Sequence, residues 1–370
     1  MILSSLRLKN LRSHKYLELI FSDGLNYIIG GNGVGKTTIL EAIYYLCTTK
    51  SNLARIDSEV VSFNENDFEI DGEFIDKTNS TVRLYYLRNE NKKFYFENNK
   101  NINRLAEVIG RYPVVLLSPA DHSITQGSPA DRRKFVDSII SQVSGTYLKI
   151  IIDYNKCLRQ RASLLNQFRE GRRKDVENEI NAWTDKLIDS GVEVIKHRIN
   201  FVANFIVHFK ESYRKILNEK EIPDIEYLFL NNLNNSDIKK NFIDQLDVVR
   251  DDEFRRGTNL VGPHRDEFIF RINDMNLKQF GSQGQHKTFQ TALRFAEFFY
   301  ITSAGGKTPL LLLDDVFGEL DKERVLKISS YLAEVGQTFI TITDLANFSF
   351  LRKSNSDKII YLDENSIRYA

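Results

Sequence analysis

The sequence predicts an α/β fold that carries an antiparallel β subdomain and an inserted α-helical, short coiled-coil-like arm. Three observations predict it. Short apolar runs typical of buried strands alternate with helical patterns near both ends of the chain. A period-two pattern of apolar residues, typical of half-buried strands, occupies residues 60–96. Apolar residues spaced by three and four, the spacing of one helix face, dominate the middle third.

The composition of the 370 residues is that of an ordinary soluble globular protein, with 42% apolar and 27% charged residues. It excludes collagen-like, disordered and disulfide-scaffold classes, since Cys47 and Cys157 can form neither a disulfide framework nor a zinc site. The 51 Lys and Arg nearly balance the 50 Asp and Glu, which argues against a uniformly basic nucleic-acid binder. Without a signal peptide or a long apolar stretch, we expect a cytoplasmic protein with no membrane partner.

The first motif follows strands expected near residues 2–8, 16–21 and 26–29. GGNGVGKT at 30–37 fits the pattern G-x-x-x-x-G-K-S/T, with a helical pattern at 38–47. The alternative is a glycine-rich turn at a helix start. As a phosphate loop, its glycines let backbone N–H groups face ATP phosphates, Lys36 reaches the β- and γ-phosphates, and Thr37 ligates Mg²⁺. The expected nucleotide-binding residues here are Gly30, Gly31, Asn32, Gly33, Val34, Gly35, Lys36, Thr37 and Thr38.

The next segment predicts an antiparallel meander with turns at 76–80 and 89–92, followed by a short buried strand at 114–117. The middle third then predicts two antiparallel helices joined near Gly171. The apolar seam from Ile195 to Ile216 fits either a coiled coil or a helix buried in a globular lobe. We expect residues 146–250 to form the arm, inserted in a discontinuous domain of residues 1–145 and 251–370.

The last third returns to strands, with a hairpin turn at 273–274, a helix at 286–300 and further strands at 310–313 and 338–343. The run LLLLDD at 310–315 is typical of a central strand that ends in carboxylates. Beside a phosphate loop, Asp314 is expected to hold Mg²⁺, directly or through water. Asp315 stands where a general base for the attacking water is needed. Its side chain is shorter than that of Glu, so we expect slow hydrolysis.

The sequence GSQGQ at 281–285 precedes the last long helix and resembles the S-x-G-Q signature of ABC-type ATPases. Taken alone, it also fits a helix cap. The resemblance implies that Ser282, Gly284 and Gln285 bind the γ-phosphate held by a second subunit, so that the active species is a head-to-tail homodimer. GELD at 318–321 resembles the D-loop of that superfamily and adds Asp321 to this interface. The fold class is therefore an ABC-type P-loop ATPase head with the β subdomain and arm described above.

Four stretches together resemble the RecF family of bacterial recombination-repair ATPases: residues 6–43, 118–137, 262–288 and 310–321. The resemblance implies that Arg12 reaches the nucleotide phosphates. It also implies an ATP-induced homodimer that binds single-stranded, gapped or junction DNA. With RecO and RecR, such a protein promotes RecA loading, gap repair, replication restart and the SOS response. Hydrolysis of ATP, weak and DNA-stimulated, acts as a switch. The chain departs from the superfamily pattern at Gly318, where Ser is usual, and at Asp344, where a switch His is usual.

Basic clusters at 132–134, 172–174 and 255–256 are candidates for DNA contacts, and residues 149–220 carry fifteen Lys and Arg against ten Asp and Glu. These charges fit contacts to the DNA backbone, but also an ordinary solvated helix surface. Two other classes fit less well. A transporter ATPase subunit needs a glutamine loop and a switch His, and a cohesin-like tether needs arms hundreds of residues long.

Overall fold

The computed structural model describes residues 1–217, 221–230, 237–319, 322–332, 334–343, 357–363 and 366–369. They form two compact units. Unit 1 comprises Met1–Asp121, Glu211–Lys220 and Lys287–Ala370, and unit 2 comprises His122–Lys210 and Glu221–His286. The proposed ends of the arm, residues 146 and 250, both fall inside unit 2. No helix in the described ranges is both long and apolar enough to span a membrane.

Unit 1 contains the antiparallel sheet that the period-two pattern predicts, with strand order β2-β1-β4-β5-β6-β7. Alternate residues of β4 and β5, such as Phe68, Ile70 and Leu84, are buried because one face of the sheet packs against the core that includes α1. Gly72 leaves room for this contact, since a Cβ there would lie 2.8 Å from a methyl carbon of Leu46 on α1. The elements are β1 (Ile2–Leu11), β2 (His14–Ile20), β4 (Asp67–Ile75), β5 (Asn79–Leu87), β6 (Lys92–Glu97), β7 (Lys100–Asn101) and α1 (Lys36–Thr48).

A second sheet in unit 1 has the order β15-β14-β3-β13-β12-β8 and is parallel except at its β15 edge. The four apolar runs predicted as buried strands become β3, β8, β12 and β13, and both faces of these strands are covered. Because the strands are parallel, their carboxyl ends meet at one edge. Their bounds are β3 (Leu25–Ile29), β8 (Val114–Leu117), β12 (Leu310–Asp314), β13 (Thr338–Ile342), β14 (Lys358–Asp363) and β15 (Ser366–Tyr369).

The helix expected at 286–300 is longer than predicted. Helix α8 (Gln283–Gly305) begins in unit 2 at the signature sequence and continues into unit 1. Helix α9 (Lys322–Leu332) follows β12, and short 3₁₀ turns lie at Asp57–Glu59, Leu105–Val108, Pro119–Asp121 and Val316–Glu319. The predicted hairpin turn is confirmed, since Asn273 and Asp274 both adopt left-handed backbone angles with φ of 49° and 63°.

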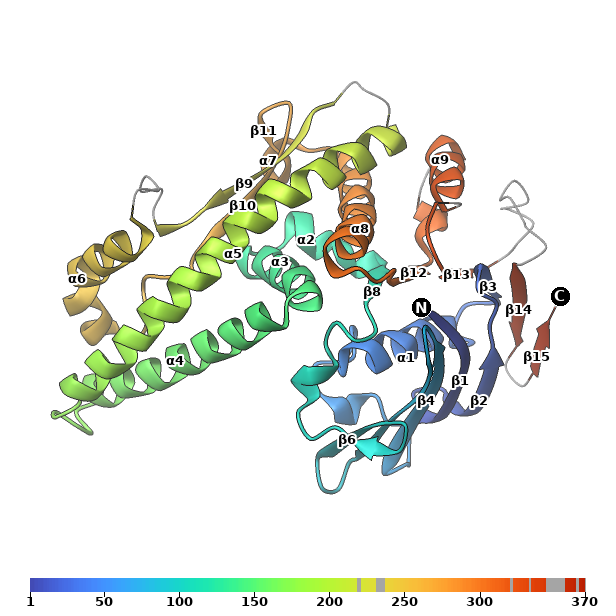
Figure 1. Ribbon diagram of the computed structural model, residues 1–370, viewed down its shortest axis with the longest axis horizontal. Helices are drawn as coiled ribbons and strands as arrows, with labels where there is room; N and C mark the ends of the chain where they lie inside the picture. The colour runs from blue at the N-terminus through green and yellow to red at the C-terminus, as the bar shows by residue number, and fades with distance from the viewer. Residues whose placement is uncertain are drawn as a thin grey trace. The chain divides into compact units, whose positions relative to one another are not determined.

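Unit 2 is mainly helical, and α4 and α5 run side by side in Figure 1, with Gly171 between them at φ 69°. One patch of α5, including Ile195, packs against Phe242 and Leu246 of α6, which is the arrangement of a globular lobe rather than a free coiled coil. Further along α5, the predicted seam residues Phe209, Tyr213 and Ile216 are buried, as expected. In the middle of the seam, Val202 and Ile206 are only half-buried, and the neighbouring Phe201 and Phe205 are buried in their place. The elements are α2 (His122–Gln126), α3 (Pro129–Val143), α4 (Gly145–Arg169), α5 (Glu177–Leu217), α6 (Ile238–Arg256), α7 (Leu277–Phe280) and the antiparallel strands β9 (Pro223–Leu228), β10 (Glu267–Ile272) and β11 (Met275–Asn276). The end of α5, residues 211–217, belongs to unit 1.

Candidate nucleotide-binding site

The predicted phosphate loop connects the carboxyl end of β3 to the start of α1, as the motif requires. Gly33 and Gly35 adopt φ of 84° and 93°, a backbone conformation that favours glycine. The Lys36 ammonium donates to the carbonyl oxygens of Gly30 and Gly31, both at 2.7 Å. Lys36 is only 8% exposed, and this burial lowers its pKa. Its amine is therefore held at the loop, where it can bind phosphate.

Two glycines of the loop are required by close neighbours. A Cβ at Gly30 would lie 2.3 Å from the carbonyl oxygen of Leu362 on β14. A Cβ at Gly35 would lie 2.3 Å from Nε2 of His14, in addition to the unfavourable φ. By contrast, Gly31 is exposed, and a Cβ there would have no neighbour within 4 Å. The loop is therefore closely packed at Gly30 and Gly35 and open at Gly31.

The two residues predicted to hold Mg²⁺ lie together. The Thr37 hydroxyl donates to Oδ1 of Asp314 at 3.0 Å, and the Thr341 hydroxyl donates to the same oxygen at 2.8 Å. Thr341 reaches it because β12 and β13 pair Asp314 with Thr341. Burial raises the pKa of Asp314, an effect that both hydroxyls oppose. Hydroxyl and carboxylate oxygens are ligands that Mg²⁺ accepts, and Mg²⁺ at nucleotide sites uses one or two protein ligands with phosphates and water. The residues therefore fit the predicted metal.

Asp315 follows on the exposed side of the strand end, where its backbone has φ 50° and its N–H donates to the Thr341 hydroxyl at 2.9 Å. The carboxylates of Asp315 and Asp314 both act electrostatically on Lys36, which places them near the loop. The structure thus brings Lys36, Thr37, Asp314 and Asp315 to one edge of the sheet. A base for an attacking water needs this combination of exposure and proximity.

Arg12 lies in the turn between β1 and β2 and contacts α1. Its guanidinium forms a two-pronged ion pair with Glu41, in which Nη2 donates to Oε1 at 2.7 Å. Glu41 is 1% exposed and also accepts a hydrogen bond from the Ser51 hydroxyl. Sequence reasoning missed Glu41, although a carboxylate within the apolar run ILEAI signals that a partner is needed.

His14, the first residue of β2 directly after this turn, is a second residue that sequence reasoning missed. Its Nε2 lies 3.1 Å from the carbonyl oxygen of Gly35, and burial lowers its pKa. No pattern in the sequence relates position 14 to position 35, because the contact arises from how the antiparallel sheet meets the phosphate loop. Arg12 and His14 together therefore connect the β1–β2 turn to both the loop and α1.

Ser118 is a third such residue. The register of β8 and β12 pairs Leu117 with Leu313, so Ser118 stands level with Asp314 at the carboxyl edge of the sheet. Its N–H donates to Oδ2 of Asp121 at 3.2 Å. The sequence shows no glutamine loop. At the end of β8, the topology places the buried Ser118 as the polar residue beside Asp314.

The signature residues Ser282, Gly284 and Gln285 lie in unit 2, at the start of α8. Ser282 and Gln285 cap the helix reciprocally: the Ser282 N–H donates to Oε1 of Gln285 at 2.8 Å, and the Gln285 N–H donates to the Ser282 hydroxyl at 3.2 Å. These contacts are those of a helix cap, the alternative interpretation of the motif. They occur at the start of a helix, which is also where the signature interpretation places Ser282 and Gln285. Asp321 and Asp344 lie outside the described residues.

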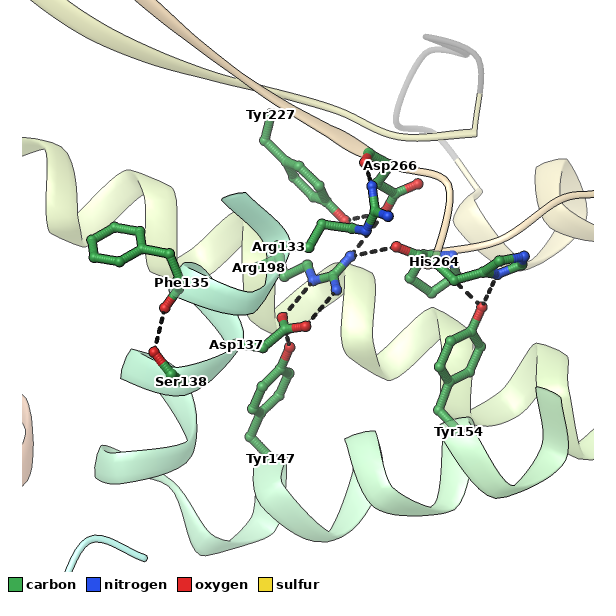
Figure 2. Close-up of polar contacts among 11 residues, drawn as sticks. Arg133, Phe135, Asp137, Ser138, Tyr147, Tyr154, Arg198, Tyr227, His264 and Asp266 are labelled. Carbon is green, nitrogen blue, oxygen red and sulfur yellow. Dashed lines mark hydrogen bonds and ion pairs between the residues drawn. The ribbon is translucent and has the colours of Figure 1, made fainter. Parts of the chain in front are cut away.

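Two of the three cations in the cluster at 132–134 are not free to contact DNA. Arg132 is 6% exposed and pairs with Glu267, and Arg133 donates to the carbonyl oxygen of Asp266 at 2.6 Å. Figure 2 shows Arg133 beside Asp266, within a polar network that joins residues 118–137 to residues 262–270. At its centre, Arg198 bonds both carboxylate oxygens of Asp137 at 2.9 Å. The parts of these two family-like stretches that belong to unit 2, residues 122–137 and 262–270, therefore contribute to its interior.

Comparison with known proteins identifies the family. A profile of the AAA domain matches residues 5–325. The DNA replication and repair protein RecF of Salinibacter ruber is 38% identical over 93% of this chain and 85% of its own length. The chain belongs to the RecF family. RecF of Chloroherpeton thalassium is similar over the full length, with 36% identity across 97% of this chain and 100% of the relative.

Solved RecF structures share the fold. The recombination mediator protein RecF solved with ATP, in the RecFOR pathway, has a TM-score of 0.90 and 28% identity, and covers 100% of this chain and 97% of that one. The Smc head domain of Pyrococcus furiosus, solved with the C-terminal domain of ScpA, has a TM-score of 0.57 and 16% identity, and covers 100% of this chain and 95% of that one. The predicted resemblance to RecF and the predicted ABC-type ATPase head are both confirmed.

Proposed function

We propose that this RecF-family chain is an ATP-dependent DNA-binding protein of recombinational gap repair and replication restart. In this proposal, ATP with Mg²⁺ induces a homodimer that binds single-stranded or gapped DNA. With RecO and RecR, the dimer promotes RecA loading and SOS induction. The observation that carries the proposal is the contact between Thr37 and Asp314 beside the buried Lys36, because this set of groups serves a nucleoside triphosphate. Relatives named RecF, one of them solved with ATP, support it.

The chain's own residues would act at the phosphates as follows. Lys36 leaves the carbonyl oxygens of Gly30 and Gly31 to bind phosphate, and the N-terminus of α1 adds its partial positive charge. Thr37 and Asp314 hold Mg²⁺, which supplies charge neutralisation at the phosphates. Asp315 accepts a proton from the attacking water, and Arg12 adds a further positive charge. Hydrolysis at this site is slow and serves to reopen the dimer.

Dimerisation follows from the signature residues, which we propose bind the γ-phosphate of the partner subunit. The residues that we propose for this contact are Ser282, Gly284, Gln285 and Asp321. The first residues of α8 lie at the positive end of a long helix, which favours an anion. ATP then acts as a ligand of the closed dimer and shifts the equilibrium toward it by its differential affinity.

The central test measures molecular mass by light scattering, with and without a non-hydrolysable ATP analogue, and the affinity for gapped DNA under the same conditions. We expect the analogue to convert monomer to dimer and to strengthen DNA binding. A chain that stays monomeric, with unchanged DNA affinity, would refute the proposal.

Two variants separate the steps of this test. Lys36→Ala should lose nucleotide binding and with it both dimerisation and DNA binding. Ser282→Arg should bind nucleotide normally but remain a monomer, because the bulk of the arginine side chain prevents close approach of the signature residues to the partner's phosphate. The matched control is Thr78→Arg, on an exposed turn of unit 1, which should behave as wild type. Normal dimerisation of Ser282→Arg would contradict the head-to-tail arrangement, in which the signature residues bind the partner's ATP.

A further inference from the structure

A buried ion cluster in unit 1 takes no part in the site described above. Arg294 of α8 donates to Oδ1 and Oδ2 of Asp121 at 2.6 and 3.0 Å, and to Oε2 of Glu297 at 2.7 Å. Asp121 is 5% exposed and Glu297 is 2% exposed. Buried charges are costly unless they are paired and hydrogen-bonded, so a cluster of this kind holds its elements in one geometry.

The three residues come from elements that lead to the two halves of the proposed ATP site. Asp121 ends the turn after β8 and accepts from the N–H of Ser118, which stands level with Asp314 at the nucleotide edge. Arg294 and Glu297 lie on α8, the helix that begins at the signature sequence. Through Asp121, the cluster therefore contacts the edge of the sheet that carries the candidate metal ligands. Through Arg294 and Glu297, it lies on α8, the helix that we call the signature helix.

The cluster also has an unusual charge balance, with one guanidinium between two buried carboxylates. Burial raises the pKa of Glu297 to about 7, although Arg294 opposes the effect. Within the part of the chain that the structure describes, Asp121 and the Tyr44 hydroxyl on α1 also act on this site, and Cys47 lies near Tyr44. A displacement of Arg294 relative to either carboxylate would therefore change both the energy and the protonation of the cluster.

We propose that Asp121, Arg294 and Glu297 form a positioning link that couples nucleotide at the edge of the sheet to the orientation of the signature helix. The link rests on the proposed function, since it acts on ATP-driven dimerisation. Nucleotide binding at Asp314 moves the Ser118–Asp121 turn. Arg294 moves with Asp121 because the two side chains are hydrogen-bonded, and α8 moves with Arg294. None of the three residues touches ATP in this scheme, so their variants should bind ATP and fail at the later step.

The test uses the full chain with Glu297→Gln and Arg294→Lys, both of which keep the size and polarity of the side chain. The control is Glu90→Gln, which removes an exposed carboxylate paired with Lys92. ATP affinity is measured on the monomer with a fluorescent analogue, thermal stability by melting, and ATP-driven dimerisation by light scattering from about pH 6 to about pH 8, a range that brackets the titration of Glu297.

We expect both variants to retain ATP affinity within about twofold, while dimerisation weakens by about 5- to 150-fold, the usual range of coupling between sites. Wild-type dimerisation should change with pH around neutrality, and Glu297→Gln should remove that change. Glu90→Gln should match wild type throughout. The proposal is overturned if both variants dimerise as wild type does, or if dimerisation falls only in proportion to ATP affinity or melting temperature.

Hydrogen exchange separates failure of the link from failure of the proposed function. In wild type, ATP should slow exchange in residues 118–121 and also in the first turns of α8. In Arg294→Lys, the effect should stop at residues 118–121. If wild type fails to dimerise with ATP, the proposed function fails, and this comparison still decides the link: equal protection of α8 in both proteins would refute it.

Discussion

At the residue scale, the glycines of the phosphate loop are not equivalent. Gly30 faces the carbonyl oxygen of Leu362, whereas Gly31 faces open space. Both are glycines in the sequence, and the motif pattern singles out Gly30 without giving the cause. The structure supplies the cause, which is that β14, from the end of the chain, approaches the first residue of the loop more closely than any Cβ permits.

This difference predicts opposite outcomes for two alanine substitutions. Gly30→Ala should lose ATP binding and stability, because a Cβ cannot approach backbone oxygen at 2.3 Å unless the loop or β14 shifts. Gly31→Ala should fold normally and bind ATP with nearly wild-type affinity. Melting temperatures and binding of a fluorescent ATP analogue check both. Equal damage in the two variants would mean that β14 does not confine the loop.

Arg12 and Glu41 give a second prediction at this scale. Removing Arg12 leaves the Glu41 carboxylate buried without its guanidinium, so Arg12→Ala should lower the free energy of unfolding by about 3 kcal/mol. In a Glu41→Gln background, the same substitution should cost well under half as much, because no buried charge is left unpaired. Urea unfolding of the four proteins measures this cycle. Additive effects would show that the pair contributes nothing specific.

At the element scale, unit 2 is held by polar contacts between helices and strands that are distant in the sequence. His264 shows how such a contact sets pH dependence. Its Nδ1 lies 2.8 Å from the Tyr154 hydroxyl. A neutral imidazole satisfies this contact, drawn as a dashed line in Figure 2, by accepting a hydrogen bond. Burial, aided by nearby arginines, lowers the pKa of His264 from 6.5 to about 4.

The lowered pKa predicts that acid destabilises unit 2. Above about pH 6.5 the imidazole is neutral in both folded and unfolded chains, so its contribution is fully present. As pH falls from 6.5 to about 4, the unfolded chain takes up a proton that the folded chain refuses, and up to about 3 kcal/mol of stability is lost. His264→Gln should show a smaller loss in urea unfolding over this range. The control is His122→Gln, which replaces an exposed histidine and should follow wild type.

At the scale of the whole molecule, the near-zero net charge conceals local differences. Lys149, Lys156 and Arg159 lie on the exposed side of α4, and within the described ranges none of them forms an ion pair. By contrast, the exposed Arg172 and the half-buried Arg173 pair with neighbouring acids. The α4 surface is therefore a better candidate for contact with DNA phosphates than the clusters that the sequence suggests.

Replacing Lys149, Lys156 and Arg159 by Gln should weaken binding to gapped DNA about equally for all sequences. The slope of log affinity against log salt should fall by about 0.7 to 0.9 for each phosphate contact that the replacements remove. A matched triple replacement of the exposed residues Lys77, Lys100 and Arg104 removes the same charge from unit 1 and should leave binding unchanged. Equal effects of the two triples would indicate a general charge effect and no defined surface.

Local sequence by itself determined most of the strands, the phosphate loop and the candidate metal ligands, because apolar periodicity, glycine spacing and a strand ending in carboxylates are local patterns. It also determined the family, through motifs in a specific order. It did not indicate β9, β14 or β15. The buried face of α5 was predicted at both ends, at Ile195 and from Phe209 to Ile216. In the middle it was predicted one position away, at Val202 and Ile206, because adjacent apolar residues leave the register of a helix face open. The structure buries Phe201 and Phe205 instead, since these rings remove more apolar surface from water.

Tertiary structure alone decided which distant residues meet. The contacts of His14 with Gly35, of Arg12 with Glu41 and of Asp121 with Arg294 join positions that no periodicity relates. It also decided that Arg132 is buried and that Arg133 is half-buried and hydrogen-bonded within unit 2, although the sequence shows them as a basic cluster. The physical reason is that the pairing of a buried charge depends on the packing of whole elements, whereas the bend of a loop or the burial of a strand is set by neighbours along the chain.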